Sequence, residues 1–231
     1  MMTIRTTAVP ALVVTALTLG SAFAGDIVGK VKYAGTAPTP AKIQVTKDQA
    51  VCGKAEHIDE TLLVGPDKGV KNVVVNISDP KDGKKYTAAA KPTLDQNGCK
   101  FVPHVDIVPA GQEVTIVNSD GILHNIHTFP KNNTPFNKAQ PKFKKEMPAT
   151  FAKPDIIQIK CDVHSWMAGW IVVAGHAYYA LTDASGTFKI DGVPAGTYTL
   201  EYWHEKLGKQ SKSVTVPATG SVTADFEYAA K

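Results

Sequence analysis

The stretch Ile157–Met167, with the sequence IQIKCDVHSWM, joins a short strand pattern to three soft metal donors. Apolar residues alternate up to Cys161, which is typical of a half-buried strand. His164 and Met167 follow, with two residues between successive donors. On one continuous strand Cys161 and His164 would point to opposite faces. The donors can therefore converge only if the chain turns just after Cys161, so that the strand ends in a tight loop.

A second imidazole is available from Ile122–His127, which follows the turn-like sequence Asn118–Gly121. In a strand His127 shares a face with Asn125, opposite to His124. His124 is therefore the favoured donor, and His127 is a neighbour of the site. Two imidazoles, one thiolate and one weak thioether form the mixed donor set that suits copper in electron transfer. Zinc prefers four strong donors and hard cations prefer oxygen.

Taken singly, each donor of the loop is better explained without a metal. Cys161 packs as a small hydrophobe in many cores, His164 fits a surface loop and Met167 fits a core. The combination of the three donors favours copper. The chain has three cysteines, and its N-terminal residues predict export to an oxidising compartment, where two of the cysteines would pair and one would remain. An odd thiol in an oxidising compartment is either reactive or protected by a metal. We predict one mononuclear copper site with His124, Cys161, His164 and Met167 as ligands.

The first 24 residues have the features of a removable signal peptide. Arg5 gives a positive start, Ala8–Leu19 is apolar, and Ala22–Ala24 is a small-residue cleavage site. The apolar stretch is too short to span a bilayer, which disfavours the alternative of a short membrane anchor. We expect cleavage after Ala24, a periplasmic protein, and no membrane span in the mature chain.

The rest of the chain predicts an all-β fold. Short runs with a period of two are separated by glycine and proline, and convincing helical periodicity is absent. Such runs occur at Val105–Ile107 and Val114–Ile116, on either side of a Pro-Ala-Gly turn, and again at Tyr198–Tyr202. The stretch Pro130–Pro154 is rich in lysine, proline and asparagine. It predicts a long loop between two strands.

Both donor segments resemble those of the cupredoxins, the small blue copper proteins that include amicyanin and plastocyanin. His124–His127 is similar to the amicyanin segment with the first ligand, and the Cys-x2-His-x2-Met spacing is that of the short amicyanin loop. The resemblance covers Leu94–Ala174. It implies a Greek-key β-sandwich and one-electron transfer. The loop departs from the family in lacking the usual proline and aromatic residue near the cysteine.

The same resemblance assigns roles to individual residues. It implies that the three strong ligands are His124, Cys161 and His164, and that Met167 is the weak axial ligand. It also implies that Asn125 joins the two donor segments by hydrogen bonds. Cys52 and Cys99 then remain for each other, and a disulfide between them is expected in an oxidising compartment.

The last fifty or so residues resemble the carboxypeptidase regulatory-like family, which has a transthyretin-type sandwich. The matching motifs are Thr182–Phe188 and Val193–Tyr198, and Ile27–Val31 looks like the first strand of the same module. The cupredoxin is then an insertion within a second, smaller sandwich. The predicted divisions are a signal peptide at 1–24, N-terminal strands of the flanking sandwich at 25–91, a cupredoxin domain at 92–175 and the C-terminal sandwich at 176–231.

These features predict a periplasmic blue copper protein that carries single electrons between redox partners such as a cytochrome c or a dehydrogenase. The alternative is a copper-binding protein or chaperone, which would expose its ligands and exchange metal. An enzyme is not expected, because a copper oxidase or nitrite reductase needs a second copper centre. After Arg5 every basic residue is lysine, which disfavours nucleic acid as a partner.

By analogy with electron carriers of this fold, His164 is expected to be exposed and to pass electrons, with Trp166 and Met167 forming an apolar patch beside it. Lysines of the predicted long loop would ring this patch and speed encounter with an acidic partner. They are Lys138, Lys142, Lys144 and Lys145. The sequence leaves open the roles of His104, His127, His176 and His204.

Overall fold

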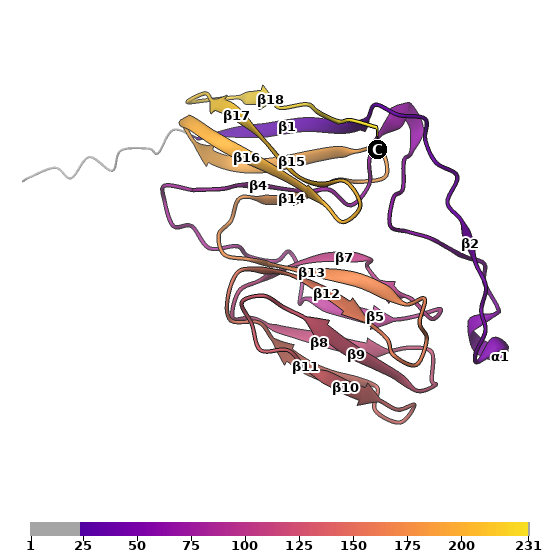
Figure 1. The fold of residues 1–231 in the computed structure, drawn as a ribbon. Coiled ribbons are helices and arrows are strands. Elements are labelled where there is room, and N and C mark those ends of the chain that lie inside the picture. Colours follow the sequence, from indigo (N-terminus) through magenta and orange to yellow (C-terminus); the bar gives the residue numbers. More distant parts are fainter. Residues whose placement is uncertain (1–23, 231) are drawn as a thin grey trace, which may run out of the picture.

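The computed structural model describes residues 24–230, so the whole of the predicted signal peptide 1–24 except Ala24 lies outside the described residues. The described chain is almost entirely β-strand and forms two sandwiches, an upper and a lower one in Figure 1. The predicted all-β fold with a second small sandwich is confirmed. Among the described residues there is no helix with the length and apolar character needed to cross a bilayer.

The lower sandwich consists of two sheets. One has the order β10 (Asn137–Gln140), β9 (His124–Phe129), β12 (Asp155–Lys160), β13 (Ala168–Ala174) and β7 (Val105–Pro109). The other has the order β11 (Glu146–Thr150), β8 (Glu113–Asn118), β5 (Thr93–Gln96) and β6 (Phe101–Val102). The inward residues of both sheets form one buried core, which includes Leu94, Ile116, Ile126, Ile157 and Ile171.

The prediction that Pro130–Pro154 forms a long loop is wrong, because this stretch contains β10 and β11. Gln140 pairs with His124 across β10 and β9, and Met147 pairs with Ile116 across β11 and β8. Met147 and Ala149 are buried while their neighbours in β11 are exposed. The two strands are thus edge strands, one in each sheet, and only a few of their side chains point into the core. The sequence of this stretch therefore has only a weak apolar alternation.

The upper sandwich combines strands from both ends of the chain. One sheet has the order β15 (Thr187–Pro194), β1 (Ala24–Tyr33) and β18 (Ser221–Thr223), and β19 (Phe226–Tyr228) also pairs with β1. The other has the order β14 (Tyr179–Leu181), β4 (Val74–Ile77), β16 (Gly196–His204) and β17 (Gly208–Val216). In sequence the lower sandwich is therefore inserted between β4 and β14.

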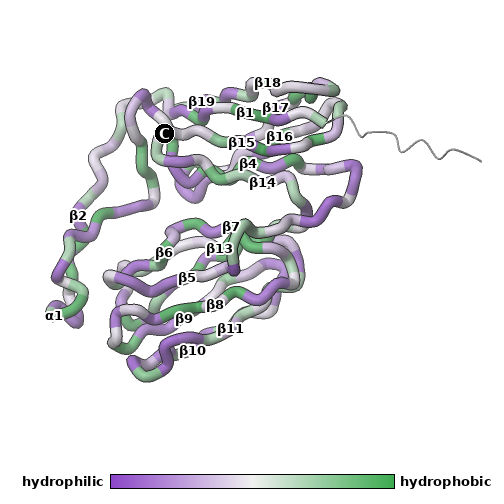
Figure 2. The backbone as a smooth tube through the Cα atoms, turned by 180° about the vertical axis from the view of Figure 1, so that it is seen from behind, coloured by the Kyte–Doolittle hydropathy of each residue, from purple (hydrophilic) through white to green (hydrophobic). Residues whose placement is uncertain are grey.

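Part of the predicted N-terminal region, 25–91, leaves the upper sandwich. Before the short 3₁₀ turn η1 (Pro66–Lys68), the chain forms β2 (Lys42–Ile43), α1 (Gln49–Cys52) and β3 (His57–Ile58). These elements descend along the lower sandwich (Figures 1 and 2). We call this excursion, Ala41–Asp59, the strap. The predicted disulfide joins its Cys52 to Cys99 of the lower sandwich and is confirmed.

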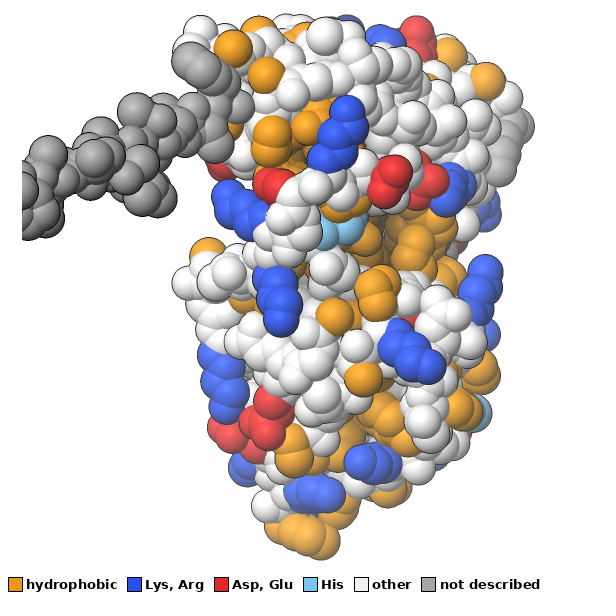
Figure 3. Space-filling model, turned by 90° about the vertical axis from the view of Figure 1, so that its left-hand side faces the viewer, with side chains coloured by type: hydrophobic (Ala, Val, Ile, Leu, Met, Phe, Trp, Pro, Cys, Tyr) orange, Lys and Arg blue, Asp and Glu red, His pale blue; other side chains and the backbone are white. Residues whose placement is uncertain are grey.

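The two sandwiches meet at a waist, where Figure 3 shows hydrophobic side chains gathered in the hollow between the lobes. Val74 of the upper sandwich and Val105 and Val172 of the lower one form a buried apolar cluster there. Nearby, the Trp170 indole nitrogen donates to Glu205 at 2.9 Å. Glu205 also pairs with His104. The structure therefore places His104 in the contact between the sandwiches.

Asp106, on the edge strand β7, leads to a prediction about how the stability of the fold depends on pH. Burial raises the pKa of its carboxyl to about 6, and a hydrogen bond from the Ile107 backbone offsets this only in part. Between pH 4 and 6 the folded chain therefore keeps a proton that the unfolded chain has lost, so stability falls as pH rises through that range. Asp106→Asn should raise the free energy of unfolding at pH 7.5 by about 1–3 kcal/mol.

The gain should fall close to zero at about pH 3, because Asp106 is then largely protonated in both the folded and the unfolded chain. Urea unfolding at the two pH values measures it. Asp79→Asn is a suitable control, since Asp79 is exposed. An Asp106→Asn variant no more stable than wild type at pH 7.5 would contradict the prediction.

Candidate metal centre

The donor loop 161–167 connects β12 to β13 in a tight turn. The Cys161 amide donates to the Met167 carbonyl at 3.1 Å, and the Met167 amide donates to the His164 carbonyl at 2.9 Å. Lys160 and Ala168 pair across the base of the loop. The predicted turn after Cys161 is therefore present, and it buries the side chains of all three predicted donors.

His124 enters the site from β9, at the end of the turn that follows β8. In this turn the Asn118 side-chain amide donates to the Ile122 carbonyl at 2.8 Å and to the Gln140 carbonyl at 3.0 Å. Gly121 has a φ of 67°, which glycine adopts without strain. The turn thereby directs His124 into the interior, where its side chain is completely buried.

Three donors converge between the two segments. The Nδ1 atoms of His124 and His164 are 3.0 Å apart, and they lie 3.9 and 3.8 Å from Cys161 Sγ. Donors that share one metal ion at bond lengths of about 2.0–2.3 Å lie about 3–4 Å from one another. Two imidazoles and a thiolate therefore fit a single ion, and their softness favours copper or zinc over magnesium or calcium.

Two carboxylates contact the imidazole nitrogens that face away from the three converging donors. His124 Nε2 lies 2.8 Å from Asp120 Oδ2, and His164 Nε2 lies 2.9 Å from Asp48 Oδ2. A carboxylate at one ring nitrogen fixes the tautomer and leaves the other nitrogen free to bind a metal. Asp120 is itself held by the backbone amides of Gly98 and Cys99, at 2.6 and 2.8 Å.

Sequence reasoning missed both carboxylates. Asp120 lies in the turn four residues before His124, so its proximity could have been suspected. Asp48 lies 116 residues from His164 in sequence, and no local pattern links the two.

Asn125 joins the two donor segments, as the resemblance implied. Its Oδ1 accepts from the Asp162 amide at 2.6 Å, the Val163 amide at 3.3 Å and Cys161 Sγ at 3.3 Å. Its Nδ2 donates to Asn137 Oδ1 at 2.7 Å. The side chain therefore fixes the loop against β9 and β10, next to the thiol.

The electrostatics of the donor groups favour an ion pair between His124 and Cys161. Burial opposes protonation of His124, but hydrogen bonds to Asp120 and Cys161 outweigh it and raise its pKa to about 9. Burial likewise opposes ionisation of Cys161, yet hydrogen bonds from His124 and nearby groups lower the pKa of the thiol. Burial lowers the pKa of His164 more than Asp48 raises it. A metal at this site would therefore replace a proton on His124.

The prediction that His164 is exposed is wrong. Its side chain has 0% relative exposure, because the strap places Asp48 against its outer nitrogen. Met167 is also buried, and Trp166 is partly buried with its indole nitrogen donating to the Cys99 carbonyl at 3.2 Å. The predicted exposed patch around His164 is consequently not available.

The remaining histidines lie outside the convergent group. His127 Nδ1 contacts Asp162 Oδ1 at 3.2 Å on the partly exposed side of β9. His57 is buried inside the strap, with Nε2 2.8 Å from the Cys52 carbonyl oxygen. The Nδ1 atoms of His176 and His204 accept backbone amides of the next turn. These contacts keep all four histidines apart from the three converging donors.

The predicted docking lysines lie close to the turn that contains Asp120. Lys138 is in β10, and the others follow in the turn to β11. This turn is next to the Asp120 turn, since the Asn118 amide donates to the Lys145 carbonyl at 2.8 Å. Phe143 stands between these lysines with 81% relative exposure, and Leu123, next to His124, has 46%.

Comparison with known proteins gives matches to parts of the chain. Residues 169–229 match the family model of the carboxypeptidase regulatory-like domain, a span that begins within β13. No curated protein matches the sequence.

Among solved structures, the chain is similar to a copper-containing nitrite reductase from Thermus scotoductus SA-01, with 25% identity and a TM-score of 0.34. That match covers 42% of this chain and 25% of the reductase. It is also similar to a reduced, Cu(I) amicyanin variant, with 19% identity, a TM-score of 0.33, and coverage of 43% of this chain and 97% of amicyanin. An oxidised amicyanin variant matches with 20% identity over the same shares and with the same TM-score.

Proposed function

We propose that this chain is an exported blue copper protein that carries single electrons. The observation that supports this most directly is the convergence of His124, Cys161 and His164, whose three donor atoms lie within 4.8 Å of one another in a buried site. Met167, buried in the same core as Cys161, supplies the weak thioether of the proposed set. Copper bound there would provide one-electron chemistry.

The contribution of the protein is to hold the donors still. Asn125 fixes the loop, and Asp120 and Asp48 fix the two imidazole rings. Such outer contacts are as much part of a metal site as the ligands. Because the donors are buried and held in advance, little rearrangement need accompany a change of charge at the centre, and water is kept away from it.

Electron transfer requires a redox partner, for which we propose a cytochrome c or a dehydrogenase with an acidic surface. The turn between β10 and β11 presents an exposed Phe143 flanked by lysines, beside the Asp120 turn. Positive charge around an apolar contact speeds association with such a partner. We propose a carrier and not an enzyme, on the ground that two imidazoles and one thiolate converge at a single buried centre around Cys161.

The second candidate is a copper-handling protein that passes the metal on. Burial of all three strong donors favours a resident metal over rapid exchange. The two functions differ in metal exchange, because a carrier keeps its copper in the presence of an acceptor protein and a chaperone does not.

The proposed function predicts one copper per chain and reversible uptake of one electron. The oxidised, copper-loaded protein should show an intense visible thiolate-to-copper band that disappears on addition of one reducing equivalent and returns on oxidation. Absorption during a redox titration, together with metal analysis, measures this. The zinc-loaded protein is the control and should be colourless. Two coppers per chain, or a centre that cannot be reduced reversibly, would contradict an electron carrier.

A further inference from the structure

The outer side of His164 is covered by a segment from outside the lower sandwich. The strap brings Asp48 to the imidazole, with 2.9 Å between Asp48 Oδ2 and His164 Nε2. The Asp48 side chain is 39% exposed while that of His164 is 0% exposed. Asp48 therefore lies between the buried imidazole and solvent.

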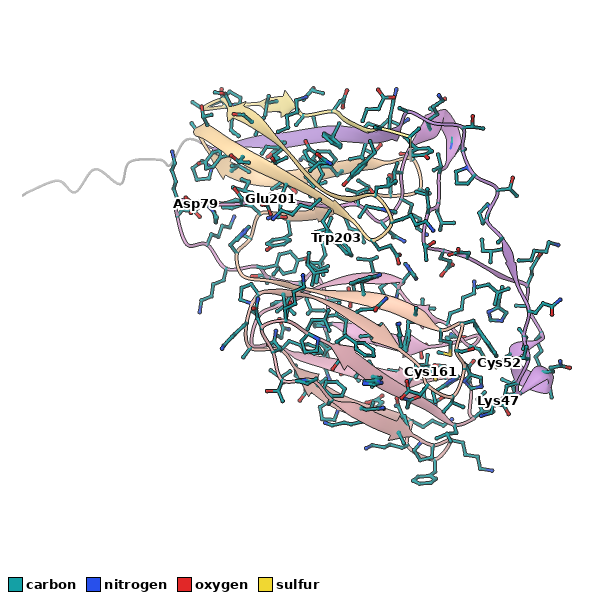
Figure 4. The ribbon with its side chains drawn as sticks, in the orientation of Figure 1. Lys47, Cys52, Asp79, Cys161, Glu201 and Trp203 are labelled. Atoms are coloured by element: carbon teal, nitrogen blue, oxygen red, sulfur yellow. A yellow bond between two sulfur atoms is a disulfide. The ribbon has the colours of Figure 1, made fainter. Side chains whose placement is uncertain are left out.

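The strap is closed at its base and fixed near its tip. At the base the Asp59 amide donates to the Ala41 carbonyl at 2.8 Å, and β2 pairs with β3. Near the tip the Cys52–Cys99 disulfide fixes α1 to the lower sandwich. Figure 4 shows Lys47, Cys52 and Cys161 at the same end of the molecule.

Side chains and backbone of the strap are adapted to this position. Val45 and Val51 pack against the core that contains Cys161. Asp48 has a φ of 50°, a left-handed conformation that aspartate tolerates better than most residues. The fold thus holds one specific carboxylate over the imidazole.

We propose that Asp48 is a positioning residue of the metal centre and that the strap is a closed gate over His164. This inference rests on the proposed copper site. The carboxylate accepts a hydrogen bond from the Nε2–H group of His164, which orients Nδ1 toward His124 and Cys161 and strengthens the imidazole as a ligand. Metal exchange, and contact of a partner with His164, then require the strap to move.

The first test is copper affinity. Asp48→Ala removes the acceptor and should raise the dissociation constant for copper by about 10–100-fold, the usual effect of losing an outer partner. Asp48→Asn keeps an amide oxygen and tolerates the same backbone conformation, so its effect should be smaller. Asp79→Asn is the matched control, because Asp79 is exposed and lies at the opposite end of the molecule (Figure 4). Competition with a chelator measures all four proteins.

The second test needs no copper. In the metal-free protein Cys161 is buried, and opening of the strap should expose it to iodoacetamide. Asp48→Ala should speed alkylation of Cys161 several-fold, while Asp79→Asn should not. Circular dichroism checks that each variant is folded.

The outcomes separate the two proposals. If Asp48→Ala matches Asp79→Asn in copper affinity, Asp48 is not a positioning residue. If alkylation of the metal-free protein is unchanged, the strap is not a gate. Failure of the wild-type protein to bind copper would overturn the proposed function, whereas the alkylation test would still decide whether the strap covers the site.

Discussion

Replacing Cys161 by serine should abolish the visible charge-transfer band of the copper-loaded protein. The band requires a thiolate, and among the described residues Cys161 is the free cysteine. Its Sγ lies 3.8 and 3.9 Å from the two imidazole Nδ1 atoms. The other two cysteines form the Cys52–Cys99 disulfide, so no other thiol can replace it. A hydroxyl is also a much poorer donor for copper than a thiolate. Absorption spectra of the two loaded proteins, at equal copper content, measure the effect.

Met167→Leu is the matched comparison. A weak axial thioether tunes the reduction potential more than it holds the metal, so this variant should keep the band and its copper while its potential rises. Survival of the band in Cys161→Ser would show that the ligand assignment is wrong. Loss of all copper from Met167→Leu would instead show that Met167 is not a weak ligand.

The sequence was sufficient to predict that His124, Cys161 and His164 converge, because their spacing carries the geometry. Two residues between Cys161 and His164 require a turn, and the structure has one, closed by the Cys161–Met167 backbone hydrogen bond. The position of His124 followed from strand parity. The carboxylate of Asp48 could not be predicted, since it reaches the site through a strap whose path depends on tertiary packing and not on local pattern.

The fold was predictable where one strand face is strongly apolar. β7, β8, β12 and β16 were expected from alternation and are present. β10 was missed because only Gln140 of its four residues is buried, and that residue is polar. Gln140 bonds instead to Gln96 at 2.5 Å and to the Ile116 carbonyl at 3.1 Å. A strand stabilised by buried amides has no hydrophobic period to detect.

The exposure of His164 was mispredicted for a related reason. The donor loop itself has the expected shape, and its burial comes from residues about a hundred positions earlier in the chain. Analogy with a single-domain electron carrier gives no indication of an added segment such as the strap. The strap itself lies between β1 and β4 in sequence, outside the inserted sandwich, and both of its ends lie toward the upper sandwich (Figure 1).

The Cys52–Cys99 disulfide should contribute strongly to stability. It closes a loop with a sequence separation of 47 residues. The chain-entropy model assigns a loop of about this length a stabilisation of about 4 kcal/mol. The double variant Cys52→Ala, Cys99→Ala should therefore lose about 4 kcal/mol of unfolding free energy, a large share of the total for a typical domain. Urea unfolding of the metal-free protein measures this without the added stability that bound copper would provide.

The comparison is best made in a Cys161→Ser background, so that no thiol can exchange with the disulfide. In that background, reduction of the Cys52–Cys99 bond should destabilise the protein as much as the double alanine variant does, because both remove the same constraint on the unfolded chain. Agreement between the two would exclude a loss caused by alanine packing alone. A loss below about 1 kcal/mol in both, well short of the usual range for a native disulfide, would mean that the strap stays in place through Val45, Val51 and the Asp48–His164 contact.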